Sequence, residues 1–428
     1  MGRFKVVVAG LLLGVVSLLA FSCASSKEKY DLVYAMFSNP KWNTFYEKVL
    51  ADFENQTGIK VKLLTIPGRE YLSKIETMMA GGEPVDVFYL NEKFVYRFAA
   101  KGKILPLDDL VASDKDFTLS IYFPRVVDAL KFRGHLYSLP VFFSTLALFY
   151  NKSLFDEAGV AYPNGDWTWD DFLKAAKALT RDKNGDGVPD VYGTALVSWF
   201  DRWAVWVWQN GGEVFSEDMT RCLLDSPQAV EAIQFYADLA NVYRVSPPFA
   251  TMKEQNVNDM FVTGKIAMVY MTRFQVESYS QIKSFEWDVA PLPHKVRRAT
   301  SFRVGGVSIS SQLQKDPERL QKAWMLVKYL TSEPVIKEML SLGNLAPAIP
   351  SLAKSSYYLT PDIPPAHDEV FYQQIPYAKI PKIGFDESAL NKIFEELEWV
   401  WMGQKKASEV LPGVTEKINE LLKEYQGM

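Results

Sequence analysis

The chain has 428 residues, with 47 Lys and Arg against 51 Asp and Glu, and a formal net charge of −4. It contains no basic tract, which excludes the electrostatic footprint of a nucleic-acid-binding protein. Its length is ample for two or more domains with a large hydrophobic core, and its 2 cysteines exclude metal sites of the CxxC type.

A targeting segment opens the chain. Basic residues precede an uncharged, mostly apolar run over 6–21, which is shorter than the ~20 residues of a membrane-spanning helix. We predict a signal peptide over 1–22, a lipid attached to Cys23 and a tether over 23–29. The alternatives are an uncleaved membrane anchor and secretion without a lipid. The mature chain is therefore expected in the periplasm or on the outer face of the cell membrane, held there by its lipid anchor.

Strands and helices alternate after the tether. Strands are expected over 30–36, 59–64 and 85–89, and helices over 42–57 and 71–79. In the first helix Phe45, Val49 and Phe53 recur at helical spacing, and Gly58 fits the position after its last turn. This order predicts a mostly parallel sheet covered by helices.

Polar and aromatic side chains follow the first and third of these strands. Ligands of open α/β sheets bind outside the carboxyl ends of the strands. Asn39 and Trp42 follow the first strand, and Asn91 and Glu92 follow the third. We predict that these four residues bind a ligand; the alternative is ordinary turn, cap and packing chemistry.

Short motifs over most of the mature chain carry a family resemblance by their order and spacing. They are Asp86-Val87-Phe88, Leu105-Pro106-Leu107-Asp108-Asp109, Gly134 to Pro140, Ala147 to Lys152 with Phe155, Thr168 to Phe172, Phe261 to Met268, Val289 to Pro293 with Gly305-Gly306, and Ala323 to Ser332. Together they resemble the extracellular solute-binding proteins of family 1, the sugar receptors of ABC importers. The chain departs from the family pattern at Phe142, where the family usually has a small residue.

The resemblance implies an α/β fold of the type II periplasmic-binding-protein kind. Each of two lobes is then a mixed, mostly parallel sheet with flanking helices. The expected limits are 30–140 plus 288–335 for the N-terminal lobe and 141–287 plus 336–428 for the C-terminal lobe. Hinges near residues 140–142 and 287–288 would let the lobes close on a ligand.

Sugar recognition needs aromatic rings for the C–H faces of a pyranose and planar polar groups for its hydroxyls. The segment 199–208 interleaves both kinds of side chain. In maltose-binding members of the family, acidic and aromatic ligand contacts fall there. The predicted ligand residues of this segment are Trp199, Asp201, Arg202 and Trp203. The tryptophans assigned to packing instead are Trp206, Trp208, Trp399 and Trp401.

Four further ligand residues come from the same comparison and from their neighbourhood. Ser144 is near a position that is acidic in maltose-binding members, and Phe274 falls at a stacking position. Arg273 and Arg303 could bind hydroxyls or a carboxylate of the ligand. For each arginine the alternative is an ion pair with another part of the protein.

One loop follows the pattern of a calcium-binding EF-hand loop. The predicted calcium ligands are Asp182, Asn184, Asp186, Val188 and Asp190. Gly193 stands where a bidentate Glu is required, so a remote carboxylate would have to complete the site. The alternative is a turn rich in Asp, Asn and Gly. No other cofactor is expected, and the calcium would be structural.

The predicted function is the substrate-binding component of an ABC-type sugar importer. The chain would capture a mono- or oligosaccharide by hinge closure, as a monomer, and deliver it to the permease subunits. The rival predictions are a carbohydrate-active enzyme and a surface carbohydrate-binding protein that serves no transporter. The sequence has no GxSxG, HExxH or P-loop motif, and its 3 histidines are not paired at metal spacing.

Overall fold

The computed structural model describes residues 30–343, 345–383 and 387–426. Its first five elements are β1 (Leu32–Phe37), α1 (Pro40–Thr57), β2 (Val61–Ile66), α2 (Tyr71–Ala80) and β3 (Val87–Asn91). α1 begins where the Asn39 side chain accepts hydrogen bonds from the first backbone amides and Pro40 occupies the first turn. It ends at Gly58, whose φ of 72° is the left-handed conformation of a helix C-terminus. The predicted alternation of strands and helices is confirmed, with bounds within a few residues.

A nine-stranded mixed sheet runs through the molecule. β1 pairs in parallel with β2 and β3. β3 pairs antiparallel with β9 (Thr300–Ile309), and β9 pairs antiparallel with the long strand β6 (Leu139–Asn151). Three short strands pair antiparallel with β6: β7 (Met268–Thr272), β8 (Trp287–Ala290) and β10 (Ala346–Pro347). β11 (Ala378–Lys379) pairs in parallel with β9. The sheet is mixed, as predicted, but the prediction that it is mostly parallel is wrong. Parallel pairing is confined to β1 with β2 and β3 and to β9 with β11, because β6 and β9 run antiparallel to each other and, apart from β11, to the strands beside them.

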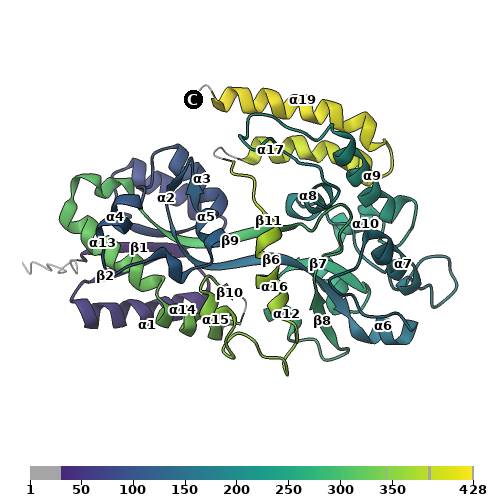
Figure 1. Cartoon of the computed structure of the whole chain (residues 1–428), viewed down its shortest axis with the longest axis horizontal. Helices are drawn as coiled ribbons and strands as arrows, with labels where there is room; N and C mark the ends of the chain where they lie inside the picture. Colours follow the sequence, from purple (N-terminus) through teal and green to yellow (C-terminus); the bar gives the residue numbers. More distant parts are fainter. Residues whose placement is uncertain (1–29, 344, 384–386, 427–428) are drawn as a thin grey trace, which may run out of the picture.

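The buried apolar side chains that the structure describes form three clusters, one in the first lobe and two in the second, and β6 and β9 pass from one lobe to the other (Figure 1). We call the cluster of the first lobe the first core and the two clusters of the second lobe together the second core. On β6, side chains up to Phe143 pack in the first core, and those from Leu146 on alternate between the two clusters of the second. On β9 and its approach, Ala299 packs in the second core and Phe302 in the first. On β6, the border between the two cores thus lies a few residues beyond the hinge predicted near 140–142. On the approach to β9, it lies about a dozen residues beyond the hinge predicted near 287–288.

The remaining described helices cover the two lobes. Around the first core lie α3 (Glu92–Ala100), α4 (Asp108–Ser113), α5 (Pro124–Asp128), α13 (Pro317–Leu330), α14 (Glu333–Met339) and α15 (Pro350–Ala353). Around the second lie α6 (Lys152–Ala158), α7 (Trp169–Leu179), α8 (Phe200–Gln209), α9 (Pro227–Asn241), α10 (Phe249–Glu254), α11 (Val257–Val262), α12 (Val276–Tyr279), α17 (Glu387–Phe394), α18 (Glu398–Trp401) and α19 (Ala407–Gln426). α16 (Glu369–Gln373) lies between the lobes in Figure 1. None of the helices in the described ranges combines the length and the apolar character that a membrane span requires.

The chain stays with the first lobe after α13. Val335 and Ile336 of α14 and, further on, Leu352 and Ala378 pack in the first core. Val370 and Phe371 pack on the second lobe, and the chain joins that lobe again at Ile383. The segment after residue 335 therefore stays mostly with the first lobe, rather than joining the second at residue 336.

Gly305 lets two aromatic rings lie across β9. A Cβ at this position would approach Phe142 Cζ to 2.4 Å and Tyr89 Cε2 to 2.8 Å, closer than carbon atoms can pack. The two rings stack with centroids 5.9 Å apart and planes 19° from parallel. This close packing places an aromatic pair where the first lobe faces the second.

Candidate ligand-binding site

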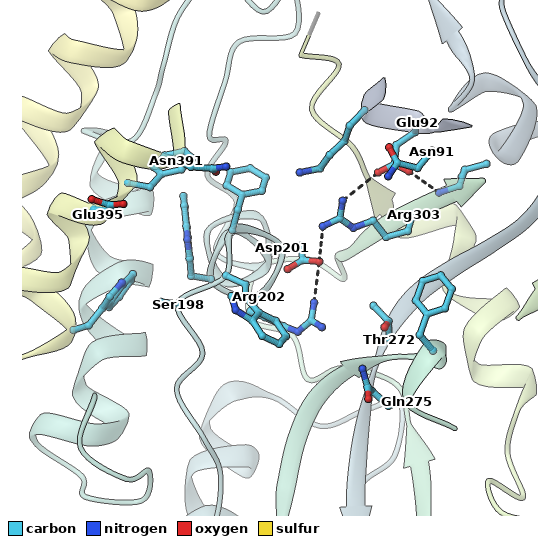
Figure 2. A pocket seen from close by; sticks show the side chains of 18 of the residues that line it. Asn91, Glu92, Ser198, Asp201, Arg202, Thr272, Gln275, Arg303, Asn391 and Glu395 are labelled. Carbon is cyan, nitrogen blue, oxygen red and sulfur yellow. Dashed lines mark hydrogen bonds and ion pairs between the residues drawn. The ribbon is translucent and has the colours of Figure 1, made fainter. Parts of the chain in front are cut away.

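A cavity of about 620 Å³ lies between the lobes. The first lobe contributes the end of β3 and β9, and the second contributes the start of α8, the short helix after β7 and the C-terminal helices. Figure 2 shows Asn91 and Glu92 on one side, Asn391 and Glu395 on the other, and Asp201 between them. The volume is within the range of sites that bind small molecules.

Aromatic rings form both walls of the cavity. On the first lobe Phe142 contacts Tyr89 and meets Phe274 edge-on, with centroids 5.9 Å apart. On the second lobe Trp199 is 49% exposed, and the guanidinium of Arg202 lies 5.3 Å from its ring centroid. Trp199 therefore offers an open indole face to a ligand, which is the platform that a pyranose ring requires.

Four charged side chains are linked by successive ion pairs across the site, which Figure 2 marks with dashed lines. Glu92 Oε1 lies 3.4 Å from Arg303 Nη1, and Glu92 Oε2 accepts a hydrogen bond from the Val304 amide at 2.9 Å. Asp201 Oδ2 accepts from Arg303 Nη2 at 3.0 Å and lies 2.9 Å from Arg202 Nη1. Arg303 thus joins a carboxylate of the first lobe to one of the second.

The pKa values of the two carboxyls move in opposite directions. Burial raises the pKa of Glu92, and Arg303 offsets this only in part. Burial also acts on Asp201, but Arg202 and Arg303 outweigh it and hold the pKa of Asp201 below its ordinary value. Asp201 is consequently an ionised hydrogen-bond acceptor at neutral pH.

Arg202 is buried beside the cavity, and one of its donors is unpaired among the described residues. Its side chain is buried, and its Nε has no hydrogen-bond partner in the described parts of the chain. Burial lowers the pKa of Arg202, an effect that neighbouring Asp201 opposes. The ionised carboxylate of Asp201, which lines the cavity, suits a hydroxyl group of a ligand, since a hydroxyl can donate a hydrogen bond to it.

The cavity brings together most of the predicted ligand residues. Those that line it are Asn91, Glu92, Trp199, Asp201, Arg202, Trp203, Phe274 and Arg303. Trp203 is almost fully buried and presents only an edge, because it packs against Phe200 and Phe394. Of the tryptophans assigned to packing, Trp206 and Trp208 are buried as predicted.

The other four predicted ligand residues lie outside the lining. Asn39 caps α1, and Trp42 is buried and stacks on Tyr46 at 5.8 Å. Ser144 is buried, and its Oγ accepts a hydrogen bond from the Arg273 amide at 3.0 Å. These side chains support the structure that surrounds the cavity.

Arg273 forms an internal ion pair instead of facing the cavity. Its Nη2 donates to Asp368 at 2.6 Å, its Nε donates to the same carboxylate at 3.0 Å, and its Nη1 donates to the carbonyl groups of Gly343 and Leu345. Both charged side chains are buried. Arg273 therefore joins the second lobe to segments of the return crossing, which corresponds to the ion-pair alternative.

Sequence reasoning missed several lining residues. They are Tyr89, Lys93, Phe142, Ser198, Phe200, Thr272, Gln275, Val304, Asn391, Phe394, Glu395, Glu398 and Trp401. Tyr89 and Lys93 lie close to predicted residues. They could have been found by the strand-end rule, by which ligands bind at the carboxyl ends of the strands. The C-terminal residues carry no local signal, and Trp401 was assigned to packing alone.

The predicted calcium loop is closed by its own hydrogen bonds. Asp182 accepts from the amides of Gly185 and Gly187 at 2.7 and 2.8 Å, and Asp186 accepts from the amide of Val188 at 2.8 Å. Within the described ranges no group of three or more His, Cys, Asp or Glu side chains is arranged to hold a metal ion. Cys23 and the predicted signal peptide lie outside the described residues.

A second cavity, of about 660 Å³, lies beside the first. Lys379 and Pro381 line it together with Trp208, Phe215 and Phe302. All three of these aromatic side chains are buried, so they present no open ring face. The first cavity is therefore the better candidate for sugar recognition.

Comparison with known proteins places the chain among binding proteins. A family model described as bacterial extracellular solute-binding protein matches residues 39–337. The chain is similar to a protein of Brucella abortus named only as a binding protein, with 24% identity over 97% of this chain and 98% of the relative. It is also similar to the maltotriose-binding protein of Pyrococcus abyssi, with 24% identity over 82% of this chain and 73% of the relative.

A solved structure shows the same fold. The ABC substrate-binding protein Lmo0181 from Listeria monocytogenes, in complex with cycloalternan, has a TM-score of 0.77 at 30% identity. The match covers 92% of this chain and 98% of that chain. The predicted two-lobed α/β fold of the type II periplasmic-binding-protein kind is thereby confirmed.

Proposed function

Because the chain belongs to the family of bacterial extracellular solute-binding proteins, we propose that it is the substrate-binding component of an ABC-type importer for a neutral mono- or oligosaccharide. The observation that carries the proposal is the cavity between the lobes, where the half-exposed ring of Trp199 stands beside the charged side chains of Asp201 and Arg202. Similar proteins bind maltotriose and cycloalternan.

The ligand is neutral because the charges of the site compensate one another. Arg303 is shared between Glu92 and Asp201, and Arg202 is paired with Asp201. A phosphate or carboxylate on the ligand would compete with these carboxylates for the arginines. Hydroxyl groups can instead bond to these charged side chains without breaking the ion pairs between them.

Capture proceeds by closure of the lobes around the sugar. One pyranose face lies on Trp199, and its hydroxyls bond to Asp201 and Arg202 of the second lobe and to Asn91 of the first. Arg303 lies where both lobes meet, and its hydrogen bond to Asp201 joins the two sides of the site. The crossings at β6 and β9 serve as the hinges of this motion. The lobes are then 30–140 plus 288–335 and 141–287 plus 336–428, with the border shifts described above.

The chain binds the sugar without cleaving it. A glycosidase needs two carboxylates with the glycosidic bond between them. Here the Arg303 guanidinium fills the space between Glu92 and Asp201. Glu92 is directed to a backbone amide and this arginine, so it has no path to a leaving-group oxygen.

The cellular setting follows from the N-terminus and the family. The chain is exported, anchored to the membrane by a lipid on Cys23, and acts as a monomer that docks on the permease subunits of its importer. A calcium ion is proposed for the loop from Asp182 to Asp190, where it would hold the turn after α7. This calcium is structural, because no residue of the loop lines the cavity.

Titration calorimetry tests the proposal with the mature chain. The panel holds mono-, di- and trisaccharides of gluco, galacto, manno and xylo configuration, with sn-glycerol 3-phosphate and a uronic acid as charged probes. We expect at least one neutral saccharide to bind and the charged probes to bind at least tenfold more weakly. Chromatography of the recovered ligand should show it unchanged, and small-angle scattering should show a more compact chain with ligand. Tightest binding of a charged probe, or release of a cleaved product, would refute the proposal.

A further inference from the structure

An exposed ion pair joins the two lobes near the cavity. Lys41 lies in the first turn of α1, where its neighbour Trp42 packs in the first core. Glu277 lies in α12, whose Val276 and Tyr279 pack in the second core. Lys41 Nζ donates a hydrogen bond to Glu277 Oε1, and the two side chains are 61% and 37% exposed. Each charge is therefore held by its own lobe, and the pair between them is in contact with solvent.

Aromatic contacts connect this ion pair to the wall of the cavity. Phe274, three residues before Glu277, lines the cavity and meets Phe142 of the first lobe edge-on at 5.9 Å. Phe142 in turn contacts Trp42, the neighbour of Lys41, at 6.2 Å. Lys41 and Glu277 themselves do not line the cavity. The pair can therefore act on the closure of the lobes without touching a sugar that lies between them.

A contact of this kind stabilises only the conformation in which the lobes are close. An ion pair needs its nitrogen and oxygen atoms within about 4 Å, so a hinge rotation that separates α1 from α12 breaks it. An exposed pair changes an equilibrium constant by up to about fivefold. The apparent affinity of a ligand rises with the fraction of the protein that is in the binding conformation. The Lys41–Glu277 pair should therefore tighten sugar binding by stabilising the closed conformation.

We infer that Lys41 and Glu277 form a latch, that is, an ion pair between the lobes that holds the closed conformation and slows the release of the sugar. The inference rests on the proposed function and goes further by assigning part of the affinity to two residues outside the ligand site. Arg303 and Asp201 also join the lobes, but both line the cavity and are less exposed than Lys41. Since salt screens exposed charges most strongly, the latch should be the salt-sensitive contact between the lobes.

Exchange of the two charges tests the latch with the best-bound saccharide of the panel above. Lys41→Glu places two carboxylates opposite each other and should weaken binding about fivefold, and Glu277→Lys should do the same. The loss should appear mainly as faster dissociation in stopped-flow tryptophan fluorescence, because the lobes must open before the sugar leaves. The variant Lys41→Glu/Glu277→Lys restores an ion pair, so its affinity and dissociation rate should return to within about twofold of the wild-type values.

Lys48→Glu is the matched control. Lys48 lies on the same helix as Lys41 and pairs with Glu338 of α14, with side chains 61% and 40% exposed. Both partners of this pair belong to the first lobe, so Lys48→Glu should leave the affinity and the dissociation rate unchanged. Raising sodium chloride from about 0.02 M to about 0.5 M should speed dissociation from the wild type about twofold, but not from Lys41→Gln, which has no charge to screen.

The outcomes separate the latch from the proposed function. A Lys41→Glu variant with wild-type affinity, or an exchanged pair that binds as weakly as the single variants, overturns the latch and leaves the sugar receptor standing. A Lys48→Glu variant that loses as much affinity as Lys41→Glu also overturns the latch, because surface charge alone would then account for the loss. A wild-type chain that binds no saccharide of the panel overturns the receptor and the latch together.

Discussion

Replacing Trp199 with Ala should weaken sugar binding about tenfold without unfolding the chain. An indole side chain has about 250 Å² of surface at most. Since 49% of Trp199 is exposed, roughly 120 Å² is open. A stacked sugar covers one face, or roughly 60 Å², which is worth ~1.5 kcal/mol at ~25 cal/mol per Å². That free energy corresponds to about one factor of ten in Kd.

Trp399→Ala is the matched control for this prediction. Trp399 is 47% exposed, nearly as much as Trp199, but it does not line the cavity. Calorimetry at one temperature should show the loss for Trp199→Ala alone, and both variants should melt within a few degrees of the wild type. Equal affinities for Trp199→Ala and the wild type would show that the open indole face is not the sugar platform.

Three further predictions concern the charges, the loop and the buried thiol. Arg303→Ala should lower the free energy of unfolding in urea by about 2–3 kcal/mol because it strands a buried carboxylate. Lys41→Ala should change it by less than about 1 kcal/mol because the Lys41–Glu277 pair is exposed; equal losses would contradict this reasoning. Calcium should raise the melting temperature of the wild type but not of Asp186→Ala, and identical melting of the wild type with and without chelator would remove the calcium proposal. Burial raises the pKa of Cys222 to about 11, so at pH 8 the native thiol should react with a disulfide reagent far more slowly than the thiol in guanidinium; equal rates would contradict its burial.

The first elements could be predicted from sequence because their signals are local. Asn39, Pro40 and Gly58 mark the two ends of α1, which is 18 residues long, and apolar spacing gives its buried face. The predicted strands are each displaced by only one or two residues from those observed. Local capping and periodicity are retained in the fold, which explains this agreement.

The strand-end rule predicted part of the site and failed for the rest. It selected Asn91 and Glu92, and both line the cavity. The same rule selected Asn39, whose side chain turns back to cap α1. The rule gives the edge of the sheet at which a ligand binds, but not the direction in which each side chain points.

Long-range partners account for the residues that the sequence could not assign. Arg273 is bound to Asp368, 95 residues away, and no periodicity links the two. In the same way Phe394 reaches Trp203 only because the last helices fold back onto α8. Such contacts depend on how the lobes pack, so they become visible only in three dimensions.

The large side chain of Phe142, which departs from the family pattern, fits because one facing residue has no side chain. A large ring at this position would collide with any side chain on the facing strand, but the facing residue on β9 is Gly305. The ring therefore packs flat against Tyr89 and meets Phe274 across the lobe border. A small residue at position 142 would leave this wall open and the cavity wider. The aromatic wall of the first lobe and the indole of Trp199 on the second thus both line the cavity, where their rings can pack on the apolar faces of a sugar.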